Sequence, residues 1–196
     1  RSDHGETQRV SRGPLSQGRH KAVEHPSFSL VVEALAFAAE RHRDQRRKDP
    51  AATPYINHPI ALVRVLYLEA RVQDPLVLCA ALLHDTVEDT GTTSQEIEAR
   101  FGLGIRDVVL EVTDDKRLPK SERKRLQVVH AAGASEAARL VKLADKICNL
   151  RDVAASPPVD WDLERQQAYF DCARKVVDPI RGTHPELEAL FDAAYA

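Results

Sequence analysis

Residues 75–90 read PLVLCAALLHDTVEDT, and this stretch decides how the rest of the chain is interpreted. Asp74 precedes Pro75, and an Asp N-cap followed by Pro at the first helical position is a typical helix start. The segment PLVLCAALLHD that follows is apolar almost all round. A helix without a polar face is buried on all sides, so we expect this one at the centre of the fold.

Helical patterns also fill the sequence on both sides of this stretch. Apolar residues recur at helical spacing, Thr93 opens a capping box, and Pro157-Pro158 ends a long helical segment. No segment alternates apolar and polar residues as a strand does. We therefore predict an all-α bundle of about eight or nine helices. The predicted helices cover residues 30–43, 58–70, 75–85, 93–101, 104–113, 119–132, 135–153, 160–181 and 185–195.

Length and composition limit the class of protein. The 196 residues carry 28 Lys and Arg against 30 Asp and Glu, for a net charge of −2, which disfavours a dedicated nucleic-acid partner. The longest apolar runs are too short to span a membrane. Three cysteines without CxxC spacing indicate a reducing compartment, the cytoplasm. Residues 1–26 have no apolar period and are expected to be a disordered leader or an expression remnant, which leaves 27–196 as one domain.

The polar end of the central segment carries candidate chemistry. His84 and Glu88 are four residues apart, and so are Asp85 and Asp89, so each pair shares a helix face. Three carboxylates this close repel one another unless a cation or several donors offset their charge. A bound metal ion is the simplest explanation.

Two further residues complete a candidate metal site. His58 begins a helix 26 residues upstream of His84, and Asp145 lies 60 residues downstream of Asp85 within the apolar run LVKLADKI. Two His and two Asp suit Mn²⁺, Fe²⁺, Co²⁺ or Zn²⁺, with positions left for water and substrate. Glu88 and Asp89 would then orient that water or move its protons.

Simpler interpretations of the same residues stay open at this point. A His-Asp pair at a helix end is often a capping or surface pair, and His58 beside Pro59 fits an ordinary helix start. A buried Asp145 is often the partner of a lysine, and Lys142 and Lys146 are both near it in sequence.

Two basic clusters stand out against the neutral total. They suggest a multiply phosphorylated substrate, although a solvated helix face also explains some members, Arg123 among them. The first cluster is Arg41, Arg43, Arg46, Arg47 and Lys48, and the second is Lys116, Arg117, Lys120, Arg123, Lys124 and Arg125.

At this level of detail the chain resembles a known family. The strings RRKDPAATPYINHPI, AALLHDTVEDT, EVTDDKRLPKSERKRLQ and AARLVKLADKICNLRD are similar to the HD-domain metallohydrolases of the RelA/SpoT family. Their spacing is most like that of the small stand-alone animal-type members, and the resemblance runs from about Leu30 to Gly182. It implies a single HD-type helical domain.

The resemblance implies an Mn²⁺-dependent hydrolase that removes the 3′-pyrophosphate of the alarmones ppGpp and pppGpp. Its metal ligands fall on His58, His84, Asp85 and Asp145, and its catalytic pair falls on Glu88 and Asp89. Its substrate-binding positions fall on Arg47 and Lys48 for the base, Asn149 for the nucleoside, Tyr55, and Lys120, Arg165 and Tyr169 for phosphate or nucleotide. The partner is a small nucleotide, and the oligomeric state is left open.

Three other functions fit the same residues. NADPH also carries a phosphate at the 2′/3′ edge of a purine ribose, so an NADPH 2′-phosphatase is one alternative. A non-catalytic nucleotide sensor is the second, although the intact ligand set and acid pair argue against it. The third is a general nucleotide phosphatase or phosphodiesterase of the wider HD group, which the RRKDP and TDDK strings disfavour.

Overall fold

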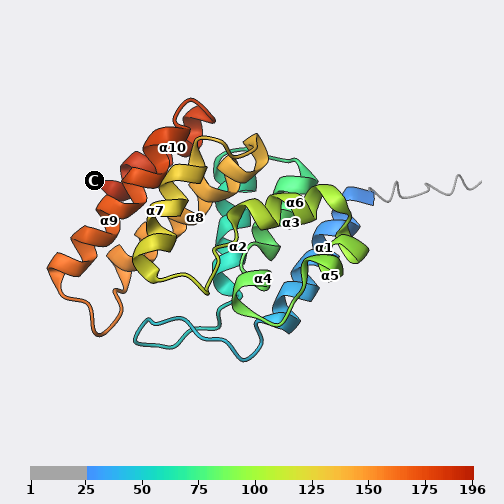
Figure 1. The fold of residues 1–196 in the computed structure, drawn as a ribbon, viewed down its shortest axis with the longest axis horizontal. Helices are drawn as coiled ribbons and strands as arrows, with labels where there is room; N and C mark the ends of the chain where they lie inside the picture. The colour runs from blue at the N-terminus through green and yellow to red at the C-terminus, as the bar shows by residue number, and fades with distance from the viewer. Residues whose placement is uncertain (1–25) are drawn as a thin grey trace, which may run out of the picture.

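A computed structural model describes residues 26–196 of the chain, and the expected leader up to residue 25 lies outside this range. The described part is all-α, as predicted, with one isolated bridge between Arg46 and Pro54 in place of any strand. Nine of its helices have eight or more residues (Figure 1). The elements are α1 (Pro26–Arg41), α2 (Asn57–Arg64), η1 (Val65–Glu69), α3 (Pro75–Leu83), α4 (Thr86–Asp89), α5 (Ser94–Phe101), α6 (Leu103–Val112), α7 (Lys120–Ala131), α8 (Glu136–Ala155), α9 (Leu163–Val177), η2 (Asp178–Ile180) and α10 (Pro185–Tyr195).

The central helix is α3, as its composition predicts. Asp74 caps it by accepting a hydrogen bond from the Leu76 amide at 2.9 Å, and Pro75 occupies its first turn. Its residues from Val77 to Leu83 are all buried, and α1, α2, α6 and α8 pack around it (Figure 1). This all-round burial positions the polar residues that follow Leu83 on a rigid support.

The end of α3 differs from the prediction. The helix stops at Leu83, two residues earlier than expected, and a separate turn, α4, holds Glu88 and Asp89. Thr86 stabilises this break, because its hydroxyl donates to the Leu83 carbonyl at 2.7 Å. The polar residues therefore lie around a helix break rather than along one straight helix.

Several other boundaries also differ. Helix α1 begins at Pro26 and ends at Arg41, so it starts earlier and stops two residues sooner than expected. The predicted helix 58–70 is α-helical only to Arg64 and continues as one π-helical turn. Helix α9 begins at Leu163, where Asp162 caps it, and passes at Asp178 into a 3-10 turn that contains Pro179, whose ring cannot continue the α-helix.

The fold brings three distant parts of the chain together. Helix α2 begins beside the end of α3, and α8 packs against both helices. Two irregular segments, 42–56 and 156–162, lie along the lower edge of Figure 1. No helix within residues 26–196 is long and apolar enough to cross a lipid bilayer.

Candidate metal centre and substrate cleft

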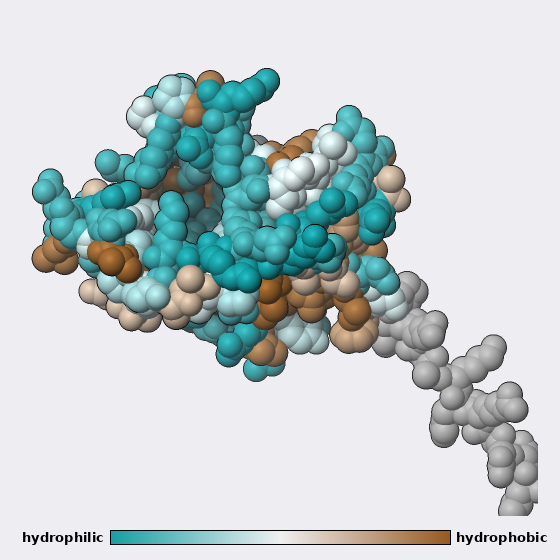
Figure 2. Space-filling view, turned by 90° about the horizontal axis from the view of Figure 1, so that it is seen from below, coloured by the Kyte–Doolittle hydropathy of each residue, from teal (hydrophilic) through white to brown (hydrophobic). Residues whose placement is uncertain are grey.

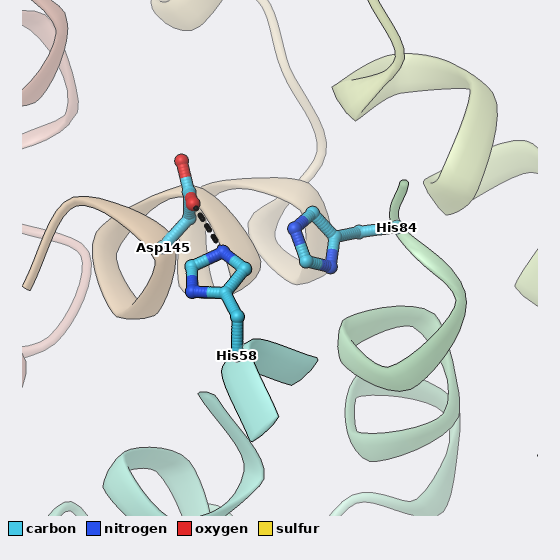
Figure 3. Close-up of side chains that lie close together, drawn as sticks. All are labelled: His58, His84 and Asp145. Carbon is cyan, nitrogen blue, oxygen red and sulfur yellow. Dashed lines mark hydrogen bonds and ion pairs between the residues drawn. The ribbon is translucent and has the colours of Figure 1, made fainter. Parts of the chain in front are cut away.

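Three predicted ligands converge where α2, α3 and α8 meet. His58 lies in the first turn of α2, His84 directly follows α3, and Asp145 lies in the middle of α8 (Figure 3). One ligand atom from each lies within 4.8 Å of the other two. His58 Nε2 is 3.2 Å from Asp145 Oδ1, and the two imidazole centroids are 5.3 Å apart. The pattern of His58, His84 and Asp145 in the sequence therefore corresponds to one place in space.

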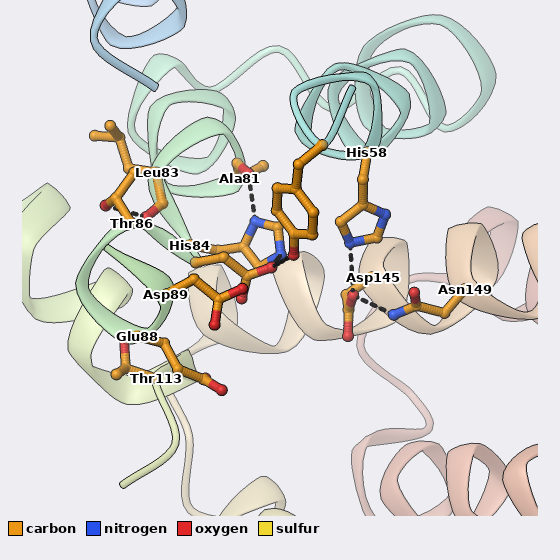
Figure 4. Close-up of polar contacts among 12 residues, drawn as sticks. His58, Ala81, Leu83, His84, Thr86, Glu88, Asp89, Thr113, Asp145 and Asn149 are labelled. Atoms are coloured by element: carbon orange, nitrogen blue, oxygen red, sulfur yellow. Dashed lines mark hydrogen bonds and ion pairs between the residues drawn. The ribbon is translucent and has the colours of Figure 1, made fainter. Parts of the chain in front are cut away.

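The His84 ring presents an unused nitrogen to this centre. Its Nδ1 lies 2.8 Å from the Ala81 carbonyl, which can only accept, so Nδ1 carries the proton and donates (Figure 4). Its Nε2 is buried and forms no hydrogen bond, although it lies in ion-pair contact with Asp85 Oδ2. A buried imidazole nitrogen that faces carboxylates is suited to bind a divalent metal, so these residues fit such an ion.

Asp85, the fourth predicted ligand, adjoins this trio. Its Oδ2 lies 2.9 Å from His84 Nε2 and also accepts a hydrogen bond from the Tyr55 hydroxyl. Burial lowers the pKa of His84, but the attraction of Asp85 outweighs it and raises that pKa to about 9. Burial raises the pKa of Asp85, yet the neighbouring imidazoles hold it below its usual range. The carboxylates of the site therefore favour a positive charge next to them, either on the His84 ring or on a bound cation.

Asp145 has both a metal-site geometry and a lysine partner. Its Oδ1 accepts from Asn149 at 2.5 Å and faces His58 (Figure 4). Its Oδ2 lies 3.0 Å from Lys146 Nζ. Burial raises the pKa of Asp145, but Lys146 and His58 outweigh it and hold that pKa well below its usual range. Of the two lysines considered from the sequence, Lys146 is the one that pairs with Asp145. The carboxylate is therefore ionised and turns one oxygen toward the imidazoles.

Glu88 and Asp89 face different spaces. Glu88 lines an inner cavity of about 150 Å³ together with Asp85 and Asp145, and its Oε2 accepts from the Asp114 amide at 3.0 Å. Burial raises the pKa of Glu88 to about 6, against the lowering effect of that amide hydrogen bond. Asp89 instead lines the outer cleft, where Gln45 donates to Oδ2 at 2.8 Å and Lys116 pairs with Oδ1.

An outer cleft of about 440 Å³ opens over the metal centre. The segments 42–56 and 156–162 both line it, and the view from that side shows a hollow bordered mostly by hydrophilic residues (Figure 2). Of the predicted substrate-binding residues, Arg47, Lys48, Tyr55, Asn149 and Tyr169 line this cleft. Most of the predicted substrate-binding set is therefore found around one opening.

The other two predicted substrate-binding residues lie farther along. Lys120 lines a second cavity of about 160 Å³, which shares Tyr169 with the cleft. Arg165 lines neither of these two spaces, but its guanidinium lies 4.9 Å from the ring of Trp161, which lines the cleft. Burial lowers the pKa of Lys120, and the nearby cations Lys124 and Arg165 lower it further. This region therefore concentrates positive charge.

The prediction missed several residues of the site and named Lys116 only as a member of the second basic cluster. Gln45 and Lys116 hold Asp89, Asp152 pairs with Arg47 at 2.5 Å, and Trp161 packs 5.1 Å from Tyr169. Gln45 and Trp161 both line the cleft. Trp161 is the single tryptophan of the chain and follows the Pro-Pro linker, which was the one available signal. Gln45 and Lys116 act through contacts that only the fold creates.

Comparison with known proteins agrees with this arrangement. Residues 34–171 match the family described as HD domain, in which a divalent metal is held by such a site. A Xenopus tropicalis protein named guanosine-3′,5′-bis(diphosphate) 3′-pyrophosphohydrolase MESH1 is 56% identical over 164 residues, covering 84% of this chain and 92% of the frog protein. The Homo sapiens protein of the same name is 57% identical over 158 residues, covering 81% of this chain and 88% of the human protein.

A solved structure extends the comparison to three dimensions. It is described as a metazoan ortholog of SpoT that hydrolyses ppGpp, and it matches with a TM-score of 0.83 at 50% sequence identity. The match covers 85% of this chain and 94% of that one. The chain therefore belongs to the HD-domain family and, within it, to the group that contains the MESH1 proteins.

Proposed function

We propose that this protein is a metal-dependent hydrolase that releases pyrophosphate from the 3′ position of ppGpp and pppGpp. The observation that carries the proposal is the convergence of His58, His84 and Asp145 beneath a cleft lined by cations. The MESH1 relatives, named as enzymes of this reaction, support the choice of substrate. Positive side chains around an acidic metal site suit a substrate with several phosphates.

The metal would be held by His58, His84, Asp85 and Asp145. Two imidazoles and two carboxylates are a borderline nitrogen and oxygen set, which supports Mn²⁺ and also accommodates Fe²⁺, Co²⁺ or Zn²⁺. When bound, such an ion lowers the pKa of a coordinated water and offsets phosphate charge. Asn149 donates to Asp145 Oδ1, the oxygen that faces His58, and Lys146 donates to Oδ2, so both carboxylate oxygens are held in place.

The two acids beside the metal site have separate roles in this proposal. Glu88 shares the inner cavity with the ligands Asp85 and Asp145, and its raised pKa suits a group that takes a proton from the attacking water. Asp89 already has a donor on each oxygen, so it holds its position and orients groups in the cleft. The proton therefore moves to Glu88 rather than to Asp89.

The substrate would lie along the cleft with its base toward the 42–56 segment. We assign Arg47 and Lys48 to packing on the base beside Tyr55, and Asn149 to the nucleoside. Lys120, Arg165 and Tyr169 would contact phosphate. The second cavity adds Arg123 and Lys124 to the cations Lys120 and Arg165, which is more positive charge than one phosphate requires. This surplus favours a pyrophosphate leaving group.

We also place the protein in the cytoplasm. All three cysteines, Cys79, Cys148 and Cys172, are free, which supports a reducing compartment. Burial raises the pKa of the Cys79 and Cys148 thiols, so both resist conversion to reactive thiolates.

Product analysis tests the proposed reaction. Purified protein is loaded with Mn²⁺ and incubated separately with ppGpp and with NADPH, and the released phosphorus species are identified by ³¹P NMR. Pyrophosphate from ppGpp is the expected result. Orthophosphate from NADPH with no product from ppGpp would make the protein an NADPH phosphatase instead. No product from either, in protein that binds nucleotide but retains no metal, would identify a sensor.

A further inference from the structure

His42 is a buried side chain beside the site that the proposed reaction does not yet use. It directly follows α1, where its amide donates to the Ala38 carbonyl at 2.9 Å, and only 1% of the residue is exposed. Its ring touches two residues that lead to the metal centre, Gln45 and Tyr55. A buried histidine that forms a hydrogen bond to one residue of the site and packs its ring on another needs an explanation beyond core packing.

The first route runs through the amide of Gln45. His42 Nδ1 lies 2.6 Å from Gln45 Oε1, and Gln45 Nε2 donates to Asp89 Oδ2 at 2.8 Å. Lys116 pairs with the other oxygen of Asp89. The carboxylate of Asp89 is therefore held between a lysine from the 113–119 segment and an amide that His42 itself contacts.

The donor and acceptor roles in these two hydrogen bonds follow from the chemistry of Asp89 at one end and His42 at the other. A carboxylate paired with lysine can only accept, so the amide must turn its NH₂ group toward Asp89 and its oxygen toward His42. His42 must then donate from Nδ1. Its Nε2 is buried without a partner, which suits a lone pair and leaves no place for a second proton. Burial lowers the pKa of His42, in keeping with a neutral ring.

The second route runs through Tyr55. The rings of His42 and Tyr55 lie 4.8 Å apart, centroid to centroid, and the Tyr55 hydroxyl donates to Asp85 Oδ2. His42 therefore contacts both the residue that holds Asp89 and the residue that holds Asp85.

We propose that His42 is a positioning residue of the hydrolytic site: as a neutral Nδ1–H donor it fixes the Gln45 amide, which in turn orients Asp89. The inference rests on the proposed function, because it assigns a purpose to the orientation of Asp89. The proposal differs from an ordinary core role, because activity should depend on the N–H donor at Nδ1 more than on the volume of the ring.

Two substitutions of His42 separate these possibilities. His42→Asn keeps an N–H donor near the place of Nδ1 but loses most of the ring, whereas His42→Phe keeps a ring and loses the donor. A positioning role predicts that His42→Phe loses about 10- to 100-fold in kcat, the range for removed supporting contacts, and that His42→Asn retains more kcat than His42→Phe. A packing role predicts the opposite ranking, because Phe fills the core better than Asn does.

Gln45→Leu tests the same hydrogen-bond path, from His42 to Asp89, by removing its middle residue. It should reduce kcat as His42→Phe does, and the double variant should be no worse than the poorer single variant, because both remove one connected path. Asp44→Asn is the matched control. Asp44 lies two residues after His42, and its side chain is 90% exposed and pairs with Arg43, so its loss should leave kcat unchanged. Thermal unfolding of each variant identifies any that fail to fold.

A spectroscopic readout keeps the inference testable without turnover. Long-range ¹H–¹⁵N NMR of the wild-type protein should show His42 as a neutral ring with its proton on Nδ1, and Gln45→Leu should abolish that signal or change its exchange rate. A proton on Nε2, or kcat values for His42→Phe at or above those for His42→Asn, would overturn the inference. Failure of the wild-type protein to act on ppGpp would instead overturn the proposed function, while the NMR result still decides the role of His42.

Discussion

His58 Nε2 lies 3.2 Å from Asp145 Oδ1, although 87 residues separate the two in sequence. His58 is fixed in the first turn of α2, and Asp145 is fixed in the middle of α8, the longest helix of the described chain. Both helices also pack on α3, which ends directly before His84. The candidate metal centre is therefore built by helix packing rather than by a flexible loop, and its geometry depends on an intact core.

Removal of one ligand should abolish metal binding. Asp145→Asn keeps the shape of the side chain and removes the charge that a cation needs. We expect no measurable Mn²⁺ binding by calorimetry and no metal-dependent turnover. Asp107→Asn, at an exposed acid on α6 paired with Arg106, is the control and should bind Mn²⁺ like the wild type. Undiminished Mn²⁺ affinity in Asp145→Asn would remove Asp145 from the ligand set.

The role of Glu88 predicts a pH dependence. Its pKa is raised to about 6, so the carboxyl is protonated below that pH and cannot take a proton from water. The kcat should therefore fall on the acid side, with a midpoint near the pKa of Glu88. Glu88→Gln should lower kcat by about 10²- to 10⁴-fold, the usual contribution of a general base, and lose this acid limb. Glu88→Gln with wild-type kcat, or with the acid limb unchanged, would assign the proton transfer to another group.

The core around α3 should dominate stability. Leu82 is buried in α3, so Leu82→Ala leaves a cavity, and we expect a loss of about 2–5 kcal/mol in the free energy of unfolding. Leu68 is 59% exposed, and Leu68→Ala should change that free energy by about 0.5 kcal/mol or less. Urea denaturation followed by circular dichroism measures both. Equal effects of the two substitutions would contradict the central position of α3.

Trp161 offers a direct signal for nucleotide binding. It is the single tryptophan of the chain, it lines the cleft, and its ring contacts both Tyr169 and Arg165. Addition of ppGpp to metal-free protein should change its fluorescence without turnover. N-acetyltryptophanamide, titrated in parallel, corrects for absorption by the nucleotide. An unchanged emission at ppGpp concentrations that saturate turnover would place the nucleotide elsewhere.

Much of the fold was predictable because its signals are local. The Asp74-Pro75 start of α3 and the Thr93 cap of α5 depend on neighbouring residues, and both are confirmed. The break after Leu83 and the π-helical turn at Val65–Glu69 were not predicted. An apolar stripe looks nearly the same through α- and π-helical turns, so periodicity does not reveal the change.

The site was predictable to the extent that its residues are unusual in their surroundings. A carboxylate inside the apolar run LVKLADKI is unfavourable unless a cation or hydrogen-bond donors offset its charge, and so are three acids directly after a buried helix. This reasoning led to the prediction of Asp145 and Asp85 as ligands. Gln45, Lys116 and His42 are ordinary residues in polar segments. Their contacts with Asp89 and Tyr55 depend on how the 42–56 and 113–119 segments fold over α4, which no local pattern records.

The most direct test of the account is an anomalous difference map from crystals of the protein soaked in Mn²⁺. The account predicts one strong peak within coordination distance of His58 Nε2, His84 Nε2 and the Asp145 carboxylate, with Asp85 turned toward it. Absence of a peak there, with Asp145 still paired to Lys146 and His84 Nε2 still paired to Asp85, would contradict a metal centre at this position.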